Sequence, residues 1–160
     1  SGFGMEVYGV DIKPVAPPPE VKEIWDIERL DDLIRISDWF IVTSPLTPET
    51  KGIIDSRRIR LLDQGTYMIV ISRGGIVDEA SLTDALLAGD IAGVGLDTTE
   101  KEPLHDDSPL WDLDNVIISP HVSAESSKLI AGRQEIFKEN LRRFLANEDF
   151  IYVCNKKAGF

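Results

Sequence analysis

The sequence predicts an α/β fold with a doubly wound parallel sheet, on two grounds. Short apolar runs typical of strands alternate with amphipathic stretches typical of helices along the 160 residues, which favours a parallel sheet with helices on both faces. Polar or charged residues also follow the strand-like runs closely: Asp11, Ser44, Arg73, Asp97 and His121. Because ligands bind outside the carboxyl ends of the strands in such sheets, we expect these side chains at one edge.

The N-terminal part of the chain predicts two strands and one helix. Residues 5–10 (MEVYGV) are rich in β-branched and aromatic side chains and predict a strand that ends at Asp11. A proline-rich loop over residues 14–19 follows, because proline fixes φ and removes a hydrogen-bond donor. Residues 27–37 carry apolar side chains at steps of three and four, which predicts a short amphipathic helix. Residues 39–42 (WFIV) then predict a buried strand.

The middle of the chain continues the alternation. A short helix is expected around residues 55–62. The run at 66–71 (TYMIVI) is apolar throughout, which is typical of a strand buried on both faces. A helix over roughly 78–88 is expected to end at Gly89, because glycine readily adopts the left-handed conformation that follows many helices.

The C-terminal part predicts two further strands and the longest helix. The strands are expected at 91–96 (IAGVGL) and 116–118 (VII). The helix is expected over 124–146 and has one apolar stripe, made of Leu129, Ile130, Ile136, Phe137, Leu141, Phe144 and Leu145.

Composition and charge exclude several classes of function. The hydrophobic fraction is 42% and the charged fraction 28%, both ordinary for a globular chain. The formal net charge of −11 argues against nucleic acid as a partner. The single cysteine, Cys154, excludes an intrachain disulfide, and with only two histidines we expect no metal site. No apolar run approaches the ~18 residues of a membrane span, so we expect no membrane contact and a cytoplasmic location.

Five motifs, in order along the chain, resemble the nucleotide-binding domain of the D-isomer-specific 2-hydroxyacid dehydrogenases. The resemblance covers essentially the whole sequence. Each motif is weak alone, but their order and spacing together are specific. They are FGMEV at 3–7 leading to Asp11, SPLTPET at 44–50, RGGIVDE at 73–79, GLD at 95–97 with EPL at 102–104, and NVI at 115–117 with Pro120-His121.

The resemblance implies a Rossmann-type domain that is incomplete at its N-terminus. The family's G-x-G-x-x-G turn and the strand before it would lie just upstream of Ser1. That strand is the central one of the sheet, so without it the strand at 5–10 would not adjoin the one at 66–71. Residues 1–123 would form the NAD-binding domain. Residues 124–160 would form a long helix and tail that pack back toward the substrate domain, and the family resemblance suggests a homodimer.

The resemblance also implies which residues hold NAD. Asp11 would accept both ribose hydroxyls of the adenosine and repel a 2′-phosphate, which favours NAD over NADP. Asp97 would hold the nicotinamide carboxamide. The alternative for Asp11 is a purely structural role, as a turn residue before the proline-rich loop. The other residues expected to contact the cofactor are Ser44, Pro45, Ser72, Arg73, His121 and Ser123.

Three residues are implied to be catalytic. Arg73 would bind the substrate carboxylate through its planar fork of donors, although an arginine in a glycine-flanked loop can also be simply exposed. His121 would be the general acid and base, because a ketone that receives hydride must also receive a proton. Glu102 would orient this imidazole and favour its charged form. A lone histidine is more often structural, but the Pro-His context after a strand favours catalysis here.

The function expected from these residues is NAD-dependent interconversion of a 2-oxo acid and a D-2-hydroxy acid. A different class also fits: an NAD(H)-sensing binding protein that resembles the C-terminal-binding-protein corepressors. A third alternative is a truncated chain or pseudo-enzyme that does neither. Turnover discriminates between the first two, because a sensor would bind NADH tightly and hardly oxidise it.

Overall fold

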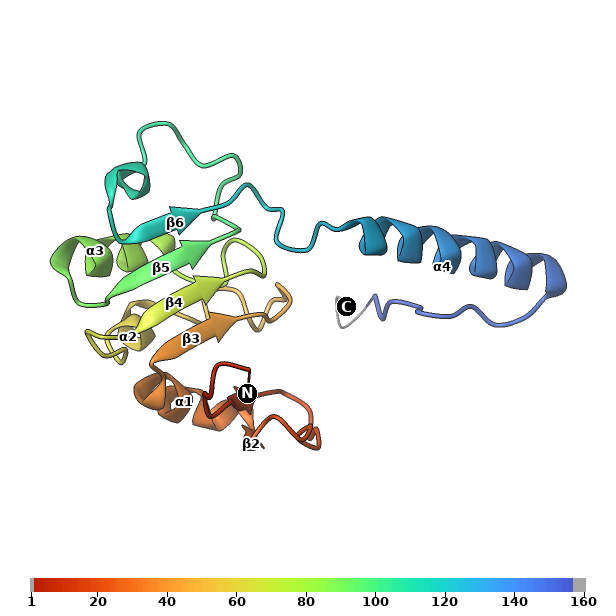
Figure 1. Cartoon of the computed structure of the whole chain (residues 1–160), viewed down its shortest axis with the longest axis horizontal. Coiled ribbons are helices and arrows are strands. Elements are labelled where there is room, and N and C mark those ends of the chain that lie inside the picture. Colours follow the sequence, from red (N-terminus) through yellow and green to blue (C-terminus); the bar gives the residue numbers. More distant parts are fainter. Residues whose placement is uncertain (1, 157–160) are drawn as a thin grey trace.

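Six parallel strands form two sheets in the computed structural model, which describes residues 2–156 (Figure 1). The smaller sheet pairs β1 (Tyr8–Val10) with β2 (Glu23–Trp25). The larger sheet has four strands in sequence order, β3 (Trp39–Val42), β4 (Tyr67–Val70), β5 (Gly93–Leu96) and β6 (Val116–Ile118). The carboxyl ends of β3 to β6 therefore share one edge.

Helical elements connect the successive strands from β2 to β6, as the alternating pattern predicts, whereas a loop joins β1 to β2. The helical elements are η1 (Ile27–Arg29), α1 (Leu30–Ile36), α2 (Ser56–Ile59), α3 (Glu79–Ala88), η2 (Pro109–Asp112) and α4 (Ser127–Ala146). The α/β class predicted from the sequence is confirmed.

Side chains and one glycine set the ends of the helices. Asp78 caps α3, because its Oδ1 accepts a hydrogen bond from the Ser81 N–H at 3.0 Å. Gly89 ends that helix in the left-handed conformation with φ 70°, as predicted. Ser126 caps α4 in the same way, accepting from the Leu129 N–H at 3.1 Å. This cap explains why α4 begins at Ser127, three residues later than the predicted start.

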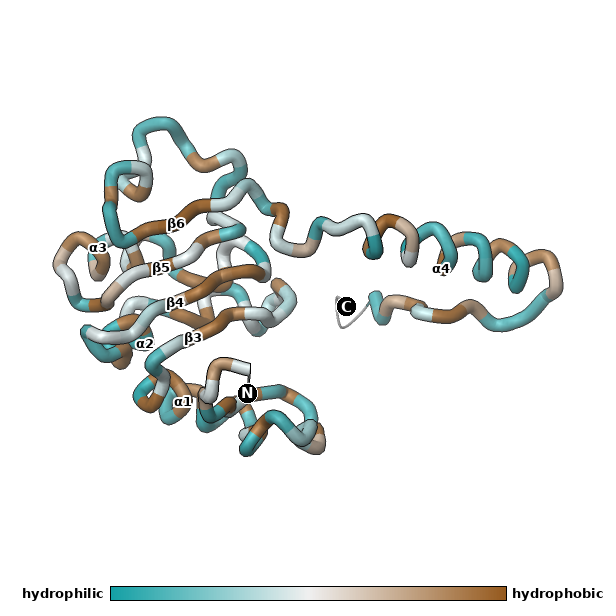
Figure 2. The backbone as a smooth tube through the Cα atoms, in the orientation of Figure 1, coloured by the Kyte–Doolittle hydropathy of each residue, from teal (hydrophilic) through white to brown (hydrophobic). Residues whose placement is uncertain are grey.

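One core lies on one face of the four-stranded sheet. Alternate strand residues point into it and pack with residues of α1, α2 and α3. These strand residues are Phe40, Val42, Met68, Val70, Val94 and Leu96. Figure 2 shows how hydrophobic the strands are compared with the loops that join them.

The opposite face of this sheet is open, which differs from the prediction for residues 66–71. Trp39 and Tyr67 are exposed there and stack on each other, with ring centroids 4.8 Å apart. Ile117 on β6 is 76% exposed. The described helices that contribute to the core all pack on the other side, so the apolar character of the run at 66–71 does not mean burial on both faces.

The smaller sheet differs in part from the elements expected at the N-terminus. The sequence pattern does not reveal β2, because three residues show no readable period. The strand expected at 5–10 covers only Tyr8–Val10. It pairs with β2 and, as expected, does not adjoin β4, which lies in the other sheet.

Helix α4 projects away from the sheets (Figure 1). None of its residues is buried, and hydrophobic and hydrophilic residues alternate along it (Figure 2). Phe137 is 70% exposed. No helix among the described residues is long and apolar enough to cross a membrane.

Candidate active site

Three loops at the carboxyl edge of the larger sheet bring Arg73, Glu102 and His121 together. Arg73 follows β4, Glu102 lies in the loop after β5, and His121 follows β6. The Nη1 atom of Arg73 lies 3.2 Å from Nε2 of His121. On the other side of the imidazole, Oε2 of Glu102 lies 2.9 Å from Nδ1. The three side chains predicted to be catalytic therefore form one continuous chain of polar contacts.

These two contacts fix the role of each ring nitrogen when the imidazole of His121 is neutral. An arginine guanidinium only donates hydrogen bonds, so Nε2 of His121 must be the acceptor from Arg73. The Nδ1–H then donates to the Glu102 carboxylate. A neutral His121 in this arrangement would carry its proton on Nδ1. The His121 and Glu102 side chains are 40% and 41% exposed, so a small molecule can reach them.

A buried carboxylate holds the loop that carries His121. Asp97 is only 4% exposed, and its Oδ1 accepts hydrogen bonds from the Ser119 hydroxyl at 2.6 Å and the Val122 N–H at 2.9 Å. Its Oδ2 accepts from the Ser123 N–H at 3.0 Å. Burial by itself raises the pKa of Asp97, but the hydrogen bonds from its loop lower it more, so the pKa lies well below its ordinary value.

The backbone of His121 is in the left-handed region, with φ 55°. For a residue with a side chain this conformation costs on the order of 1 kcal/mol and persists only when the surroundings enforce it. Here the bonds from Asp97 to the next two backbone N–H groups enforce it, together with the bond from the His121 N–H to the Ser119 carbonyl at 3.0 Å. Asp97 therefore holds the backbone from which the imidazole of His121 projects.

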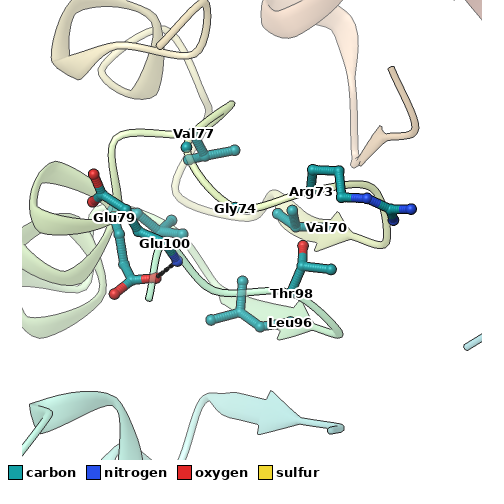
Figure 3. Close-up of a pocket in the computed structure, with 10 residues that line it drawn as sticks. Val70, Arg73, Gly74, Val77, Glu79, Leu96, Thr98 and Glu100 are labelled. Atoms are coloured by element: carbon teal, nitrogen blue, oxygen red, sulfur yellow. Dashed lines mark hydrogen bonds between the residues drawn. The ribbon is translucent and has the colours of Figure 1, made fainter. Parts of the chain in front are cut away.

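The loop of Arg73 is fixed against the neighbouring loop. A Cβ atom at Gly74 would overlap the backbone carbonyl of Thr99, so only glycine allows this approach. Figure 3 shows the small hollow between these loops, with the Arg73 side chain directed away from it. The dashed bond in Figure 3 is the 2.7 Å contact in which the Glu100 N–H donates to Glu79 of α3.

Two hydroxyls at this edge are buried without a hydrogen-bond partner in the described part of the chain. They are Ser72 Oγ, directly before Arg73, and Thr98 Oγ1, directly after Asp97. Buried hydroxyls are normally satisfied, so each has unused capacity to bind a ligand or a water molecule.

A larger hollow, of about 500 Å³, lies beside the smaller sheet. Asp11 at the end of β1 and Trp25 at the end of β2 line it, together with part of the proline-rich loop. Asp11 is exposed, and its Oδ1 accepts a hydrogen bond from the Lys13 N–H at 2.8 Å.

The remaining predicted residues lie at strand ends but are not bonded to the Arg73–His121–Glu102 chain. Ser44 is half-buried, and the carbonyl of the exposed Pro45 accepts a 2.6 Å hydrogen bond from the Thr50 hydroxyl. Within residues 2–156, no hydrogen bond joins Asp11, Ser44 or Pro45 to the three catalytic candidates. No three potential metal ligands of this part of the chain gather in one place.

Sequence reasoning missed two residues of this site. Ser119 supports Asp97 and could have been noticed, because it is the first polar residue after a predicted strand. Trp25 lines the larger hollow, and its position depends on β2, which the sequence pattern does not show.

Comparison with known proteins identifies the family of the chain. A family model described as the NAD binding domain of D-isomer specific 2-hydroxyacid dehydrogenases matches residues 1–123. The chain belongs to this family.

The relatives of this chain within the D-2-hydroxyacid dehydrogenase family include glyoxylate reductases and D-3-phosphoglycerate dehydrogenases. It is 35% identical to a glyoxylate reductase of Thermococcus kodakarensis, covering 99% of the chain and 49% of the relative. It is 34% identical to a D-3-phosphoglycerate dehydrogenase of Mycobacterium bovis, covering 99% of the chain and 30% of the relative. The chain thus spans about half, or less, of the length of the curated relatives it matches.

Solved structures match the fold closely. A D-isomer specific 2-hydroxyacid dehydrogenase from Xanthobacter autotrophicus, in complex with NADPH and MES, is 36% identical with a TM-score of 0.89. The match covers 98% of the present chain and 64% of the chain in that structure. An NADPH-dependent glyoxylate/hydroxypyruvate reductase from Sinorhizobium meliloti is 29% identical with a TM-score of 0.90, covering 99% and 51%.

Proposed function

We propose that the whole protein interconverts a 2-oxo acid and a D-2-hydroxy acid by hydride transfer with NAD. The observation that carries this proposal is the chain of contacts from Arg73 through His121 to Glu102. It combines a group that binds carboxylates with a proton donor and a carboxylate that orients that donor. The relatives named glyoxylate reductase and D-3-phosphoglycerate dehydrogenase support the same class of reaction.

Each of the three residues has a distinct role in this proposal. Arg73 binds the substrate carboxylate through two parallel N–H donors. Nε2 of His121 gives a proton to the substrate oxygen during reduction and takes it back during oxidation. Glu102 holds Nδ1, which orients the ring and stabilises its charged form. Bound nicotinamide cofactor supplies or accepts the hydride.

The residues at the sheet edges fit such a cofactor. The hollow beside Asp11 has the size of a ligand pocket and would take the adenosine end. Asp97, which accepts hydrogen bonds from the Ser119 hydroxyl and from two backbone N–H groups, is the acceptor that we place beside the nicotinamide carboxamide. The unpartnered Ser72 hydroxyl lies at the same edge. We place Ser44, Pro45 and Ser123 as further neighbours of the cofactor.

We also propose that NAD is preferred over NADP, because the Asp11 carboxylate repels a 2′-phosphate. Two of the similar solved structures are complexes with NADPH or NADP, so the preference has to be measured directly. In the whole protein, Asp11→Ala should weaken NADH binding and narrow the gap between NADH and NADPH. The exposed Asp114→Ala, which lies far along the chain just before β6, is the matched control. An unchanged ratio of the two affinities would show that Asp11 is only a turn residue.

The proposed reaction is tested by measuring NADH oxidation with a panel of 2-oxo acids. Turnover that requires a 2-oxo acid and yields the D-hydroxy acid is the expected result. Tight NADH binding with hardly any turnover would instead indicate an NAD(H)-sensing binding protein.

The C-terminal segment has a separate role in this proposal. We propose that the segment expected over residues 124–160, of which 157–160 lie outside the described residues, packs back toward the substrate domain of the whole protein; this would account for an α4 that carries an apolar stripe but buries no residue here. Family resemblance further suggests a cytoplasmic homodimer.

A further inference from the structure

We infer that Thr50 is a positioning residue for the nicotinamide cofactor, because its hydroxyl fixes the loop that presents Ser44 and Pro45. This inference rests on the proposed function and deepens it, since it adds a residue that acts on the cofactor only through its own loop. Thr50 is half-buried and lies in the segment 43–55 between β3 and α2.

The hydroxyl of Thr50 closes the first part of this segment. Its Oγ1 donates to the carbonyl of Pro45 at 2.6 Å and accepts from the N–H of Thr47 at 2.7 Å. A threonine hydroxyl has a single proton, and the bond to Pro45 is shorter than the alternative to the Thr47 carbonyl at 3.4 Å. The proton of Thr50 is therefore engaged within its own loop, so Thr50 positions the loop and leaves the cofactor contacts to Ser44 and Pro45.

The backbone around Thr50 forms one tight turn that ends at a left-handed glycine. The N–H groups of Thr50 and Lys51 both donate to the carbonyl of Thr47, at 3.2 and 3.0 Å. Gly52 follows with φ 64°, a conformation in which a residue with a side chain would be strained. The turn therefore has a defined end, and the hydroxyl of Thr50 fixes its beginning to Pro45.

The end of the same turn is tied to the loop that carries Arg73. The Gly52 N–H donates to the carbonyl of Gly75 at 2.8 Å, and Gly75 is also left-handed, with φ 84°. An isolated parallel bridge between Ile54 and Val77 continues this contact. The segment is thereby held at two points, by the Thr50 hydroxyl near β3 and by the glycine contact at the loop after β4.

These two attachments have different consequences for binding and for chemistry. Pro45 is exposed, and exposed loops are more mobile than the strands they follow. A loop that is fixed before binding loses less conformational entropy when it meets a ligand, so the affinity is higher. Without the Thr50 hydroxyl, binding must order Pro45 and Thr47. The bond between Gly52 and Gly75 does not involve this hydroxyl, so the loop after β4 keeps its place and the chemical step changes less.

The inference is tested in the whole protein with variants that separate the hydroxyl from the shape of the side chain. Thr50→Val keeps the shape and removes the hydroxyl, Thr50→Ala also lacks the hydroxyl, and Thr50→Ser retains it. Thr66→Val is the matched control, because the Thr66 hydroxyl also donates to a backbone carbonyl, that of Ser37 at 2.9 Å, but at the amino end of β4. Thr66 is more deeply buried than Thr50, so this control also shows what a loss of stability alone does.

The first measurement is the affinity for NADH, or for NADPH where that binds more tightly, by fluorescence titration. We expect a loss of about fivefold to tenfold in Thr50→Val and Thr50→Ala, as for one lost hydrogen bond. Thr50→Ser and Thr66→Val should stay within about twofold of the wild type. In steady-state rates, KM for the cofactor should rise by the same factor in Thr50→Val, while kcat changes by less than about twofold.

The second measurement is amide hydrogen exchange, which needs no turnover. The Thr47 N–H should exchange faster in ligand-free Thr50→Val than in the wild type, because its acceptor is gone, and bound NADH should restore part of its protection. Equal cofactor affinities of the wild-type and Thr50→Val proteins, or an equal loss in Thr50→Ser or Thr66→Val, would overturn the inference even in a protein that reduces 2-oxo acids. A protein that shows the selective loss of affinity but reduces no 2-oxo acid overturns the proposed reaction and leaves the inference standing. A whole protein that binds neither NADH nor NADPH overturns both.

Discussion

At the scale of single residues, Asp97 shows how one buried carboxylate positions a reactive group on a neighbouring loop. It binds the Ser119 hydroxyl and two backbone N–H groups that follow His121, and so holds the histidine in a left-handed conformation. These bonds lower the pKa of Asp97 below its ordinary value despite its burial. The position of the imidazole therefore depends on a residue that the sequence associates only with the cofactor.

Asp97→Asn should destabilise the whole protein by about 1–3 kcal/mol at pH 7, because the amide NH₂ would face a backbone donor and leave it unsatisfied. Since the folded-state pKa of Asp97 is depressed, its stabilisation is present above the unfolded-state pKa, about 4, and is lost as pH falls through the folded-state pKa. The difference between variant and wild type should therefore shrink at low pH. Urea unfolding at pH 7 and pH 3.5 measures it, and the exposed Asp114→Asn serves as control. A pH-independent difference would contradict the argument.

The second residue-scale prediction concerns the reaction itself. His121→Ala should reduce turnover by ~10²–10⁴-fold while NADH binding largely survives, because a general acid is lost. Glu102→Gln should reduce turnover by a smaller factor, since the imidazole remains. Its pH profile for 2-oxo acid reduction should decline at lower pH than in the wild type, because the protonated imidazole has lost its carboxylate partner. Steady-state rates across pH measure both effects.

The double variant provides the check on this pair. It should be scarcely slower than His121→Ala alone, as expected for groups that act as one unit. Additive losses, or a pH profile unmoved by Glu102→Gln, would mean that Glu102 does not act through His121.

At the scale of elements, the site depends on how closely the loops after β4 and β5 approach each other. The first contains Arg73 and Gly74, and the second leads from Asp97 to Glu102. The approach is so close that a side chain at Gly74 would overlap the Thr99 carbonyl. The bond from the Glu100 N–H to Glu79 ties the second loop to the start of α3. Two of the three loops of the site, together with one helix, thus support Arg73 and Glu102.

Gly74→Ala should therefore separate the two loops. We expect a loss of about 1–3 kcal/mol in the free energy of unfolding, as for other overpacked positions, and a lower turnover because Arg73 moves relative to His121. Gly95→Ala is the matched control, because a Cβ there meets nothing within 4 Å. Chemical unfolding and steady-state rates compare the two variants. Equal stability of both proteins would show that the loops can move apart at no cost.

At the scale of the whole molecule, the structure combines one well-packed core with two apolar surfaces that residues 2–156 leave largely exposed. One is the open face of the four-stranded sheet, with Trp39, Tyr67 and Ile117. The other is the stripe of α4, which includes Phe137, Leu141 and Phe144. Soluble chains rarely leave contiguous apolar patches exposed, so such surfaces are typical of contact sites.

If α4 packs against the substrate domain, its stripe is buried in the whole protein. Phe137→Ser should then cost about 3 kcal/mol of stability, as for a phenylalanine removed from a core. Gln134→Ser, on the same helix and also exposed here, should be nearly neutral. The two variants are compared by chemical unfolding of the whole protein and of the 160-residue chain. A cost for Phe137→Ser no greater than that for Gln134→Ser in the whole protein would contradict this packing.

The sequence alone determined the class of fold, most strand positions and the family. Strands such as residues 39–42 could be predicted because short apolar runs between turn residues are typical of buried strands. The end of α3 at Gly89 could be predicted because a glycine in the left-handed conformation ends many helices. Arg73, Glu102 and His121 were predicted because parallel strands place their carboxyl ends at one edge and because their motifs resemble those of the family. The strand β2 could not be predicted, because three residues are too few to show a period.

Only the tertiary structure decided what these residues do to one another. The three hydrogen bonds of Asp97 join positions 22 to 26 residues apart, a separation that no local pattern encodes. The contacts on the two ring nitrogens of His121 likewise come from Arg73 and Glu102, which approach from two different loops. The open face of the sheet likewise depends on where the helices pack, because an apolar strand has the same sequence pattern whether one face is covered or both. Such properties belong to pairs of atoms brought together by folding, so they exist only in three dimensions.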